Sequence, residues 1–352
     1  MSIPAHVRDF LDHKFFERGA FMKDYGSESI VLGKGGEFRK LTSADTPETF
    51  FYLKDFYEDT YLAYFPSETL SLKASELTDL ADSWDKKVNF VTAVENEDSL
   101  YENDFFRAKA AFGEDFHKVV LVSREEFQLN LAAEGRKHFF VRALNFGTGL
   151  PYGIWSEEFG CVGSTPEILF SHKDDQLATF ALAGTMAKGQ EKELLQSEKN
   201  LEEHRLVIKD LTEKLSTIGN DMSIGVTGLL PYKNIVHLKT NIKIRVPKDL
   251  SPLKITSLLS PTAALGGYPQ TKALQFLTET DYGKRHPQRF FGSAFGLKSH
   301  DMNQALVTIR NIQWHGNTFV IESGGGVVPD SDLEKELEEI KMKRESIKGH
   351  YL

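Results

Sequence analysis

Short runs of β-branched and aromatic residues, separated by turn-forming residues, dominate the hydrophobic pattern of the chain. Such runs are typical of β-strands, because branched and aromatic side chains pack well on a pleated surface. The pattern predicts strands at 88–93, 118–123, 138–146, 153–155, 160–162, 167–171, 177–182, 305–313 and 317–322. The last two form a predicted hairpin, in which a His315-Gly316-Asn317 turn joins Ala305–Trp314 to Thr318–Glu322.

Helical periodicity is found in fewer and longer segments. In Glu191–Ile218 apolar residues recur near the helical period of about 3.6 residues, with acids and bases between them. Asp332–Lys348 has the same pattern, follows a capping Asp330 or Ser331, and carries acids in its first turns, as the helix dipole favours. Further helices are predicted at 4–18, 101–113 and 271–280. Because the strands come in groups and do not alternate strictly with helices, we predict an α+β fold with antiparallel sheets.

Composition narrows the domain organisation and the classes of partner. The chain has 352 residues, of which 40% are hydrophobic and 26% charged, as in an ordinary globular protein. That length permits one large domain or two smaller ones, and no repeat or linker divides it, so we predict a single domain over residues 1–352. The formal net charge of −9 argues against nucleic-acid binding, which needs a basic surface that displaces counterions.

Cysteine usage and the lack of long apolar runs bear on the compartment. Cys161 is the only cysteine, so no internal disulfide framework can form and a reducing compartment is expected. The segment Met1–Lys23 is too polar for a signal peptide, and no run approaches the ~20 apolar residues of a membrane span. We therefore expect a cytoplasmic protein without a membrane partner.

Three charged residues stand where a charge is costly unless it has a partner. Lys118 opens an apolar strand, and burial there would lower the pKa of its ammonium group, which is how a lysine becomes a general base. Glu167 stands between a turn and the apolar run Ile168–Phe170, and Arg310 follows four strand-forming residues. The forked guanidinium of an arginine suits a bound carboxylate. Each of the three could also be an internally paired or solvated residue.

The remaining candidates are less distinctive. The acids in Glu202–His204 and Glu338–Glu339 lie on amphipathic helices, where acids usually form a solvated face. His237 lies in a short apolar stretch and is either a packed histidine or a pocket residue. Zinc spacing of cysteine, histidine and aspartate is lacking, whereas carboxylates beside an anionic substrate would suit Mg²⁺. The glycine-rich turn Gly33–Gly36 lacks the spacing of a P-loop.

Taken in order, these residues fall into blocks that resemble the chorismate-utilising enzymes, the family of anthranilate, aminodeoxychorismate, isochorismate and salicylate synthases. The resemblance covers roughly residues 100–350, whereas residues 1–90 hold no block that can be matched. The blocks are Lys118–Leu121, Gly163–Leu169, Leu182–Thr185, Glu198–His204, His237–Thr240, Pro261–Pro269, Ile309-Arg310, Gly324–Val328, Ser331-Asp332 and Glu339–Lys343. The family implies two antiparallel β-sheets packed as a sandwich with helices outside, and an active site in a cleft between the sheets.

Within this family the chain is most similar to the isochorismate synthases. These resemble it in having, at the place of Lys118, a lysine that activates water, whereas anthranilate synthases that use ammonia have glutamine there. Aminodeoxychorismate synthases carry a nucleophilic lysine at the place of Ala183. Salicylate synthase is the nearest alternative, although many of those enzymes have tyrosine at the place of Phe291. A non-catalytic chorismate-binding protein with the same fold is a second alternative.

The resemblance also implies a role for each site residue. Lys118 would be the general base that deprotonates water for attack at C2 of chorismate, and Glu167 the general acid for the departing C4 hydroxyl. Glu203 and Glu339 would hold Mg²⁺, which binds the ring carboxylate. The residues implied in substrate binding are Ala183, Gly184, Thr185, His237, Ile309, Arg310, Gly324 and Lys343. No glutaminase subunit is implied, and a monomer or homodimer is expected. The product would feed menaquinone, siderophore or salicylate synthesis.

The chain departs from the family pattern at three places. Ser123-Arg124 comes one residue later than in related sequences, which implies either a bulge after Lys118, the version we favour, or a register shift that puts Val119 in its place. The spacing around Arg285 and Arg289 is longer than in the family, so either could be the local arginine. The first 90 residues are short for the family, which implies a trimmed auxiliary sheet.

Overall fold

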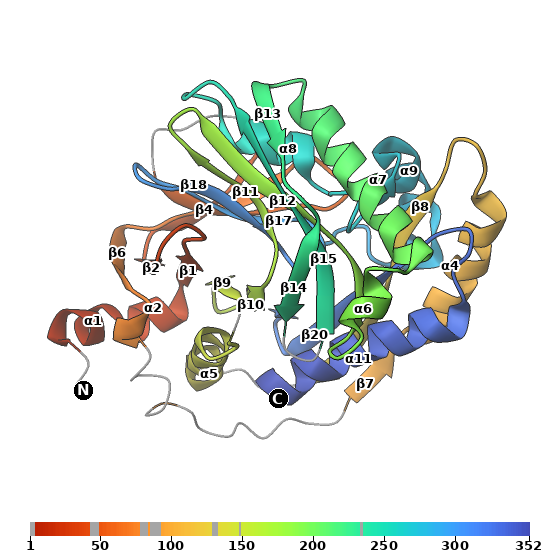
Figure 1. The fold of residues 1–352 in the computed structure, drawn as a ribbon. Coiled ribbons are helices and arrows are strands. Elements are labelled where there is room, and N and C mark those ends of the chain that lie inside the picture. The colour runs from red at the N-terminus through yellow and green to blue at the C-terminus, as the bar shows by residue number, and fades with distance from the viewer. Residues whose placement is uncertain are drawn as a thin grey trace.

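The computed structural model describes residues 4–42, 49–77, 84, 93–128, 133–147, 149–232 and 235–352. In these residues the strands form two antiparallel β-sheets of ten strands each, with helices packed around them (Figure 1). The predicted α+β sandwich with antiparallel sheets is therefore confirmed. No helix in the described ranges is long and apolar enough to cross a membrane.

The first sheet contains the strand that begins with Lys118. Its order is β16 (Gly267–Tyr268), β8 (Lys118–Gln128), β20 (Thr318–Val327), β19 (Asn311–His315), β10 (Phe159–Thr165), β9 (Leu150–Trp155), β1 (Gly19–Lys23), β2 (Ser29–Lys34) and β6 (Glu68–Lys73), with β7 (Ala93–Asn96) also paired to β8. The predicted hairpin is present, since β19 pairs with β20 from Gln313↔Val320 to His315↔Thr318.

The second sheet contains the strands that follow Glu167 and carry His237. Its order is β13 (Asn220–Ile224), β15 (Ile235–Arg245), β12 (Gln176–Ala187), β11 (Ile168–Lys173), β18 (Asn303–Val307), β17 (Ala294–Lys298), β4 (Phe50–Lys54), β5 (Tyr61–Phe65) and β3 (Glu37–Leu41), with β14 (Gly228–Tyr232) also paired to β15. Residues 19–73 thus add three strands to each sheet, so the N-terminal part of the chain is built into both.

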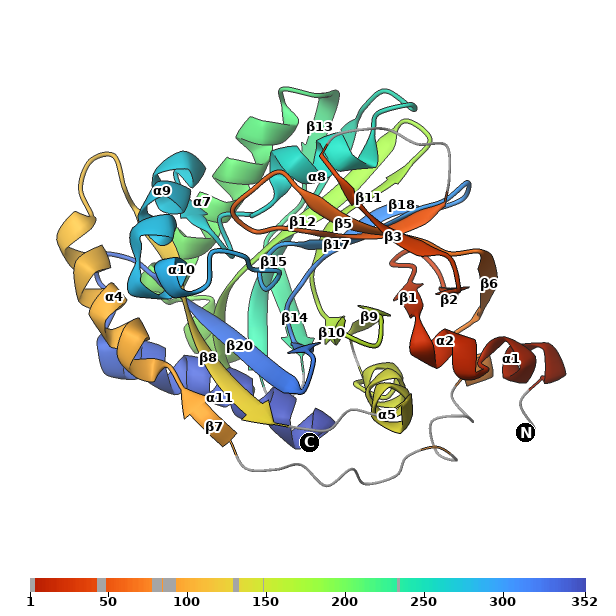
Figure 2. The ribbon, with the colours of Figure 1, turned by 180° about the vertical axis from the view of Figure 1, so that it is seen from behind.

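The two sheets pack face to face over an apolar core, in which Met22 and Ile154 of the first sheet meet Phe51, Phe180 and Phe295 of the second. Helices cover the outer faces (Figures 1 and 2). They are α1 (Ala5–Phe10), α2 (His13–Glu17), α4 (Asp98–Ala111), α5 (Ala133–Leu144), α6 (Glu191–Leu194), α7 (Glu198–Leu215), α8 (Pro252–Leu259), α9 (Gln270–Glu279), α10 (Asp281–Arg285) and α11 (Leu333–Tyr351).

Each outer face has its own buried cluster. Phe139 and Phe140 of α5 and Tyr351 of α11 pack on the first sheet beside Trp155 and Trp314. On the second sheet, α7 buries Val207, Leu211 and Leu215 of the predicted apolar stripe, and α8, which the pattern did not predict, buries Ile255 and Leu259. Burial of these stripes, more than intrinsic helix propensity, holds the helices in place.

Several segment predictions are corrected by the structure. The strand predicted at 138–146 lies in α5 instead, where Phe139, Phe140 and Ala143 face one side, a spacing that a short apolar run does not distinguish from a strand. The single helix predicted at Glu191–Ile218 is broken into α6 and α7 by Ser197, whose side chain accepts a hydrogen bond from the Asn200 N–H as an N-cap. The predicted strand at 88–93 lies outside the described residues except for its last residue.

Two further boundaries differ from expectation. The predicted strand 305–313 stops at Val307 and resumes at Asn311, because Arg310 between them has a φ of 56°, which a strand cannot hold. The segment 4–18 forms two short helices, α1 and α2. The cap of α11 is Asp332, whose side chain accepts from the Lys335 N–H at 3.1 Å, and neither Asp330 nor Ser331.

Candidate active site

A pocket lies between the two sheets. Its lining comes from β8 and β20 of the first sheet, from β12 and β15 of the second, and from side chains of α7 and α11. The predicted site residues that line it are Glu167, Ala183, Gly184, Thr185, Glu203, His237, Ile309, Arg310, Gly324, Glu339 and Lys343.

Lys118 is fully buried and is not itself among the residues that line this pocket, which it adjoins through Glu203. Its Nζ is 2.9 Å from Glu203 Oε1, and apart from this ion pair it has no hydrogen-bond partner among the described residues. Side chains alternate along a strand, so Lys118 points to the same face as Val120, which lines the pocket. Val119 instead packs with Tyr101 in a separate apolar cluster, which excludes it from the place of Lys118.

The bulge predicted after Lys118 is wrong. The pairing of β8 with β20 runs without interruption from Val119↔Val327 to Gln128↔Thr318. Lys118 itself pairs with Tyr268 of β16. The later position of Ser123-Arg124 therefore reflects no extra residue in the strand.

Glu167 stands directly before β11, with its backbone held on both sides. Its N–H donates to Thr165 Oγ1 at 3.2 Å, and its carbonyl accepts from the Val307 N–H at 3.0 Å. Burial raises the pKa of the Glu167 carboxyl to about 8, although the positive charge of Lys118 opposes the rise. The carboxyl group is therefore protonated near neutral pH and available as a proton donor.

A bulge in β12 places the next group of predicted residues. The pairing of β12 with β15 shifts register between Ala183 and Thr185. Gly184 between them has a φ of 77°, and an added Cβ would lie 3.1 Å from the Asn200 carbonyl oxygen, so glycine is required here. The bulge turns Thr185 toward α7, where its N–H donates to Asn200 Oδ1 at 3.2 Å.

His237 of β15 faces the pocket as a neutral imidazole. Its Nδ1 lies 2.8 Å from Thr185 Oγ1, and its Nε2 has no partner among the described residues. Burial lowers the pKa of His237 to about 3, helped by the positive charges of Arg310 and Lys343. The sequence left open whether His237 is packed or a pocket residue, and the structure places it in the pocket wall.

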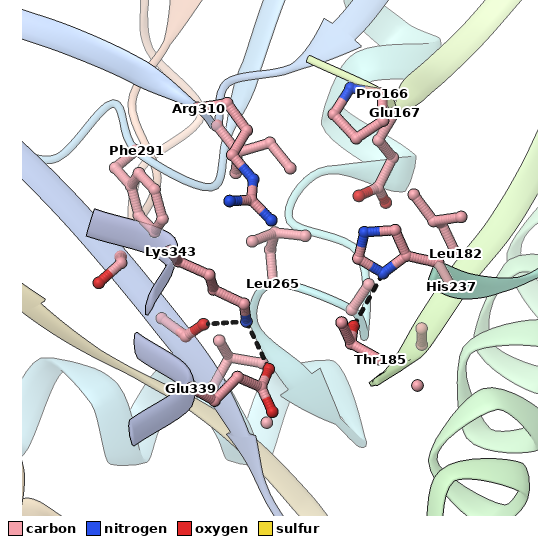
Figure 3. A pocket seen from close by; sticks show the side chains of 18 of the residues that line it. Pro166, Glu167, Leu182, Thr185, His237, Leu265, Phe291, Arg310, Glu339 and Lys343 are labelled. Atoms are coloured by element: carbon pink, nitrogen blue, oxygen red, sulfur yellow. Dashed lines mark hydrogen bonds and ion pairs between the residues drawn. The ribbon is translucent and has the colours of Figure 1, made fainter. Parts of the chain in front are cut away.

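Arg310 brings a buried positive charge into the pocket from the loop between β18 and β19 (Figure 3). Its φ of 56° is uncommon for a residue with a side chain and implies local strain. The guanidinium carbon lies 5.6 Å from the centre of the Tyr232 ring. Burial lowers the pKa of Arg310, and Tyr232 and Glu339 counter this, so the guanidinium stays charged.

The glycine-rich end of β20 lets two helices bring polar side chains against the strand. Lys343 Nζ donates to the Gly324 carbonyl at 2.8 Å and pairs with Glu339, one helical turn before it, at 2.6 Å (Figure 3). A Cβ at Gly326 would lie 2.4 Å from Glu203 Oε1 of α7. Any larger residue at Gly326 would therefore displace Glu203.

Glu203 and Glu339 fit the requirements of a hard divalent cation. Burial alone would raise the pKa of Glu339, but Lys343, Lys199 and Arg310 outweigh it and keep the carboxylate ionised. In the described ranges no three His, Cys, Asp or Glu side chains converge closely enough to hold a metal by themselves. Two carboxylates supplemented by water and substrate oxygens are the set that Mg²⁺ commonly takes, whereas zinc prefers nitrogen and sulfur ligands.

Apolar side chains form much of the rest of the wall. They are Val120, Pro166, Leu182, Ala264, Leu265, Phe291 and Ile347. The first five lie inside blocks that the sequence matched, whereas Phe291 and Ile347 lie outside them. The pocket is thus an apolar slot lined by both cations and acids, with Lys343 and Glu339 paired at its wall.

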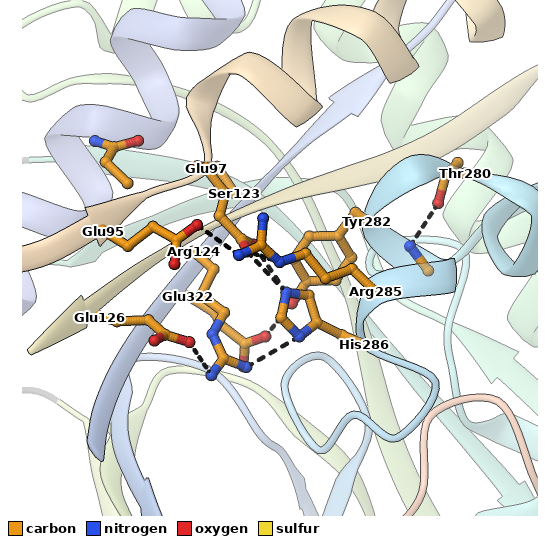
Figure 4. Close-up of polar contacts among 12 residues, drawn as sticks. Glu95, Glu97, Ser123, Arg124, Glu126, Thr280, Tyr282, Arg285, His286 and Glu322 are labelled. Atoms are coloured by element: carbon orange, nitrogen blue, oxygen red, sulfur yellow. Dashed lines mark hydrogen bonds and ion pairs between the residues drawn. The ribbon is translucent and has the colours of Figure 1, made fainter.

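Glu322 is a further pocket residue that the sequence reasoning missed. It is 4% exposed and lies two strand positions before Gly324. It accepts a hydrogen bond from the hydroxyl of Tyr282 (Figure 4). It accepts another from Gln313 Nε2. With both donors in place, its carboxylate is satisfied by the protein itself. Because side chains alternate along a strand, counting back two residues from Gly324 would have identified Glu322 as a pocket residue.

The two arginines left open by the sequence occupy different environments. Arg285 lies at the surface, where it pairs with Glu95 and Glu97 (Figure 4). Arg289 is 3% exposed and packs its guanidinium 3.3 Å from the centre of the Phe56 ring, while its Nε donates to the Phe291 carbonyl. Neither lines the candidate active site, but Arg289 supports the segment that presents Phe291 to it.

The site between the two sheets combines a buried lysine, a protonated glutamic acid and the two cations Arg310 and Lys343. A family model assigns the chain to a known class of enzymes. Residues 68–349 match the family model described as chorismate binding enzyme, and the chain belongs to this family.

Individual relatives come from two branches. The chain is 29% identical over 236 residues to isochorismate synthase MenF of Haemophilus influenzae, which covers 64% of this chain and 54% of the relative. It is 28% identical over 279 residues to anthranilate synthase component 1 of Acetivibrio thermocellus, which covers 73% and 54%. The matched part of the chain therefore spans about half the length of each of these curated relatives.

Solved structures show the same fold at low sequence identity. The structure of MenF, the menaquinone-specific isochorismate synthase of Escherichia coli, superposes with a TM-score of 0.81 at 18% identity, covering 98% of this chain and 92% of that one. The structure of DhbC from Bacillus anthracis, titled a 2,3-dihydroxybenzoate-specific isochorismate synthase, gives a TM-score of 0.78 at 18% identity and covers 95% and 96%.

Proposed function

We propose that the protein converts chorismate to isochorismate in a Mg²⁺-dependent reaction. The observation that carries the proposal is the fully buried Lys118, which lies on the pocket face of β8 near a glutamic acid with a pKa of about 8. A base and an acid of this kind are what an allylic exchange of one hydroxyl for another requires. The family model and the isochorismate synthases among the relatives support the same reaction.

In the proposed mechanism the chain binds a dianion and moves two protons. Arg310 and Lys343 hold the carboxylates of the substrate, and the neutral His237 offers Nε2 to one of its polar groups. The walls formed by Leu265 and Phe291 exclude bulk water from the ring. Glu203 and Glu339 would hold Mg²⁺, which when bound neutralises the ring carboxylate.

The chemistry itself uses Lys118 and Glu167. In its neutral form, Lys118 takes a proton from a water molecule whose oxygen bonds to C2 of the ring. The double bonds shift, the C4–O bond breaks, and Glu167 gives its proton to the departing hydroxyl, which leaves as water. Water enters and water leaves, so the product is an isomer of the substrate.

The test is incubation of the purified protein with chorismate and Mg²⁺, followed by chromatographic separation of the products. We expect isochorismate alone, with formation stopped by EDTA and restored by added Mg²⁺. Salicylate with pyruvate would replace this proposal with salicylate synthase. Anthranilate on addition of ammonia would assign the protein to the other branch. No product, together with a raised melting temperature in chorismate, would identify a binding protein.

A further inference from the structure

Lys199 lies beside the acids of the pocket and has no role in the mechanism above. It is the second residue of α7, and its Nζ pairs with Glu336 Oε1 at 2.6 Å. The side chain of Glu336 is only 2% exposed, and its other partner is Ser331, whose hydroxyl donates at 2.8 Å. A carboxylate buried to this degree needs a positive neighbour, and Lys199 provides it.

Acids other than Glu336 also act electrostatically on Lys199. Burial would lower the pKa of its ammonium group, but Glu336, Glu203 and Glu339 together raise it above its ordinary value. Two of these, Glu203 and Glu339, are the carboxylates proposed for Mg²⁺. Glu203 follows Lys199 by one turn of α7, and Glu339 follows Glu336 by one turn of α11. The ammonium of Lys199 therefore draws on the same negative potential that a divalent cation would use.

A second acidic environment adjoins Lys199 on the outside. A separate surface pocket is lined by Lys199 together with Glu198, Glu202 and Asp330. The side chain of Lys199 is 35% exposed, and its flexible four-carbon stem allows the ammonium to turn outward without movement of α7. Lys199 thus has an inner and an outer set of acids within reach of one side chain.

We propose that Lys199 is a tethered counter-ion, which pairs with Glu336 beside the metal carboxylates while the metal is absent and turns to the surface pocket when a divalent cation binds. The inference rests on the metal site of the proposed function. Because the two cations repel each other, each lowers the affinity of the inner acids for the other. The measured free energy of Mg²⁺ binding then includes the free-energy cost of displacing Lys199.

The first experiment is calorimetric titration of MgCl₂ alone into EDTA-treated, dialysed protein without chorismate. In K199Q the competing charge is gone, and the Kd for Mg²⁺ should fall by about tenfold, the scale expected for one unit charge near a partly buried site. K199R keeps the charge and should bind as the parent does. Lys209 lines the same surface pocket but faces Glu213 at 4.0 Å, so K209Q is the matched control and should leave the Kd unchanged.

A second readout separates competition from a purely structural role. In EDTA, K199Q should melt at a lower temperature than the parent, because Glu336 loses its counter-ion, and saturating Mg²⁺ should remove most of that difference. A deficit that Mg²⁺ does not repair would overturn the proposal. An unchanged or larger Kd in K199Q would do the same, as would a lack of Mg²⁺ binding in both proteins.

These outcomes are distinct from failure of the proposed function. Isochorismate formation together with an unchanged Kd in K199Q would remove the counter-ion role and leave the reaction standing. Tighter Mg²⁺ binding in K199Q without any isochorismate would do the reverse.

Discussion

Lys118 is the residue on which the proposed chemistry depends most. Replacing it by methionine removes the base while keeping an unbranched side chain of similar length in a fully buried place. We expect kcat to fall by roughly 10²–10⁴-fold, the usual contribution of general base catalysis, with the fold retained. Steady-state kinetics and circular dichroism check this.

The matched control is Lys243→Met at a solvent-exposed position of β15, which should have the activity of the parent. A Lys118→Met protein with near-parental kcat would show that another group activates the water.

Glu167 predicts a pH dependence with a definite sign. Since burial raises the pKa of its carboxyl from 4.5 to about 8, the proton-donating form predominates below pH 8 and is lost above it. We expect kcat to decline as the pH rises through about 8, and Glu167→Gln to be inactive at every pH. A pH–rate profile measures the decline, and a profile that stays level to pH 10 would contradict the role of Glu167 as the acid.

The same residue links stability to pH. Glu167 binds its proton more tightly in the folded chain than in the unfolded one, so its contribution to stability is complete below pH 4.5 and is lost as the pH rises toward 8. Glu167→Gln removes this dependence. The melting temperature of the variant should gain on that of the parent between pH 5 and pH 9.

At the residue scale, the sequence predicted the chemical groups better than the walls. Lys118, Glu167, Arg310 and Lys343 stand in motifs or in places where a charge needs a reason, and all four lie in or at one pocket. Ile347 lies on α11 outside every matched block, and only the folded chain brings it to the pocket, so no local motif could mark it.

At the scale of elements, the glycine end of β20 controls how closely α7 approaches. In Gly326→Ala the new Cβ would meet Glu203 Oε1 at 2.4 Å and Lys118 Cε at 3.0 Å. Both are ends of long side chains that can move, so we expect the protein to fold with little change in stability but to lose most of its activity. Urea denaturation and the product assay together check this.

Gly349→Ala is the comparison within α11. Nothing lies within 4 Å of the added Cβ, and alanine favours a helix over glycine by up to ~1 kcal/mol, so this variant should be active and slightly more stable. Full activity in Gly326→Ala would show that the contact between Glu203 and Lys118 is dispensable.

Element type was predicted where the periodic pattern is long and was less certain where it is short. The helix α11 and the hairpin of β19 and β20 were recognised because many residues agree on one period. The strand predicted at 138–146 became α5, since a few adjacent apolar residues suit either structure and only the surface of the first sheet decides between them.

For the whole molecule, the N-terminal strands are the least predictable part, and yet they complete one end of each sheet. Strand β1 pairs with β9, and β4 pairs with β17, across more than a hundred residues of chain. No local signal carries such partners, so the sequence motifs left residues 1–90 unassigned.

This pairing predicts that the chain unfolds as one unit. A shortened chain of residues 93–352 would expose the edges of β9 and β17 and open the apolar core around Phe295 and Ile154. We expect it to aggregate or to lack a cooperative melting transition, as judged by soluble expression and calorimetry. A soluble fragment with a sharp transition would show that the remaining strands form a domain of their own.

Arg310 makes the thermal stability of this protein depend inversely on its activity. A residue with a side chain is held at a φ of 56°, and its charge is buried without a carboxylate ion pair among the described residues. Arg310→Gly would relieve the backbone strain and the desolvated charge together, so the inactive variant should melt at a higher temperature than the active parent. Among random variants of this protein, those with a raised melting temperature would then include variants at Arg310 that no longer bind the substrate.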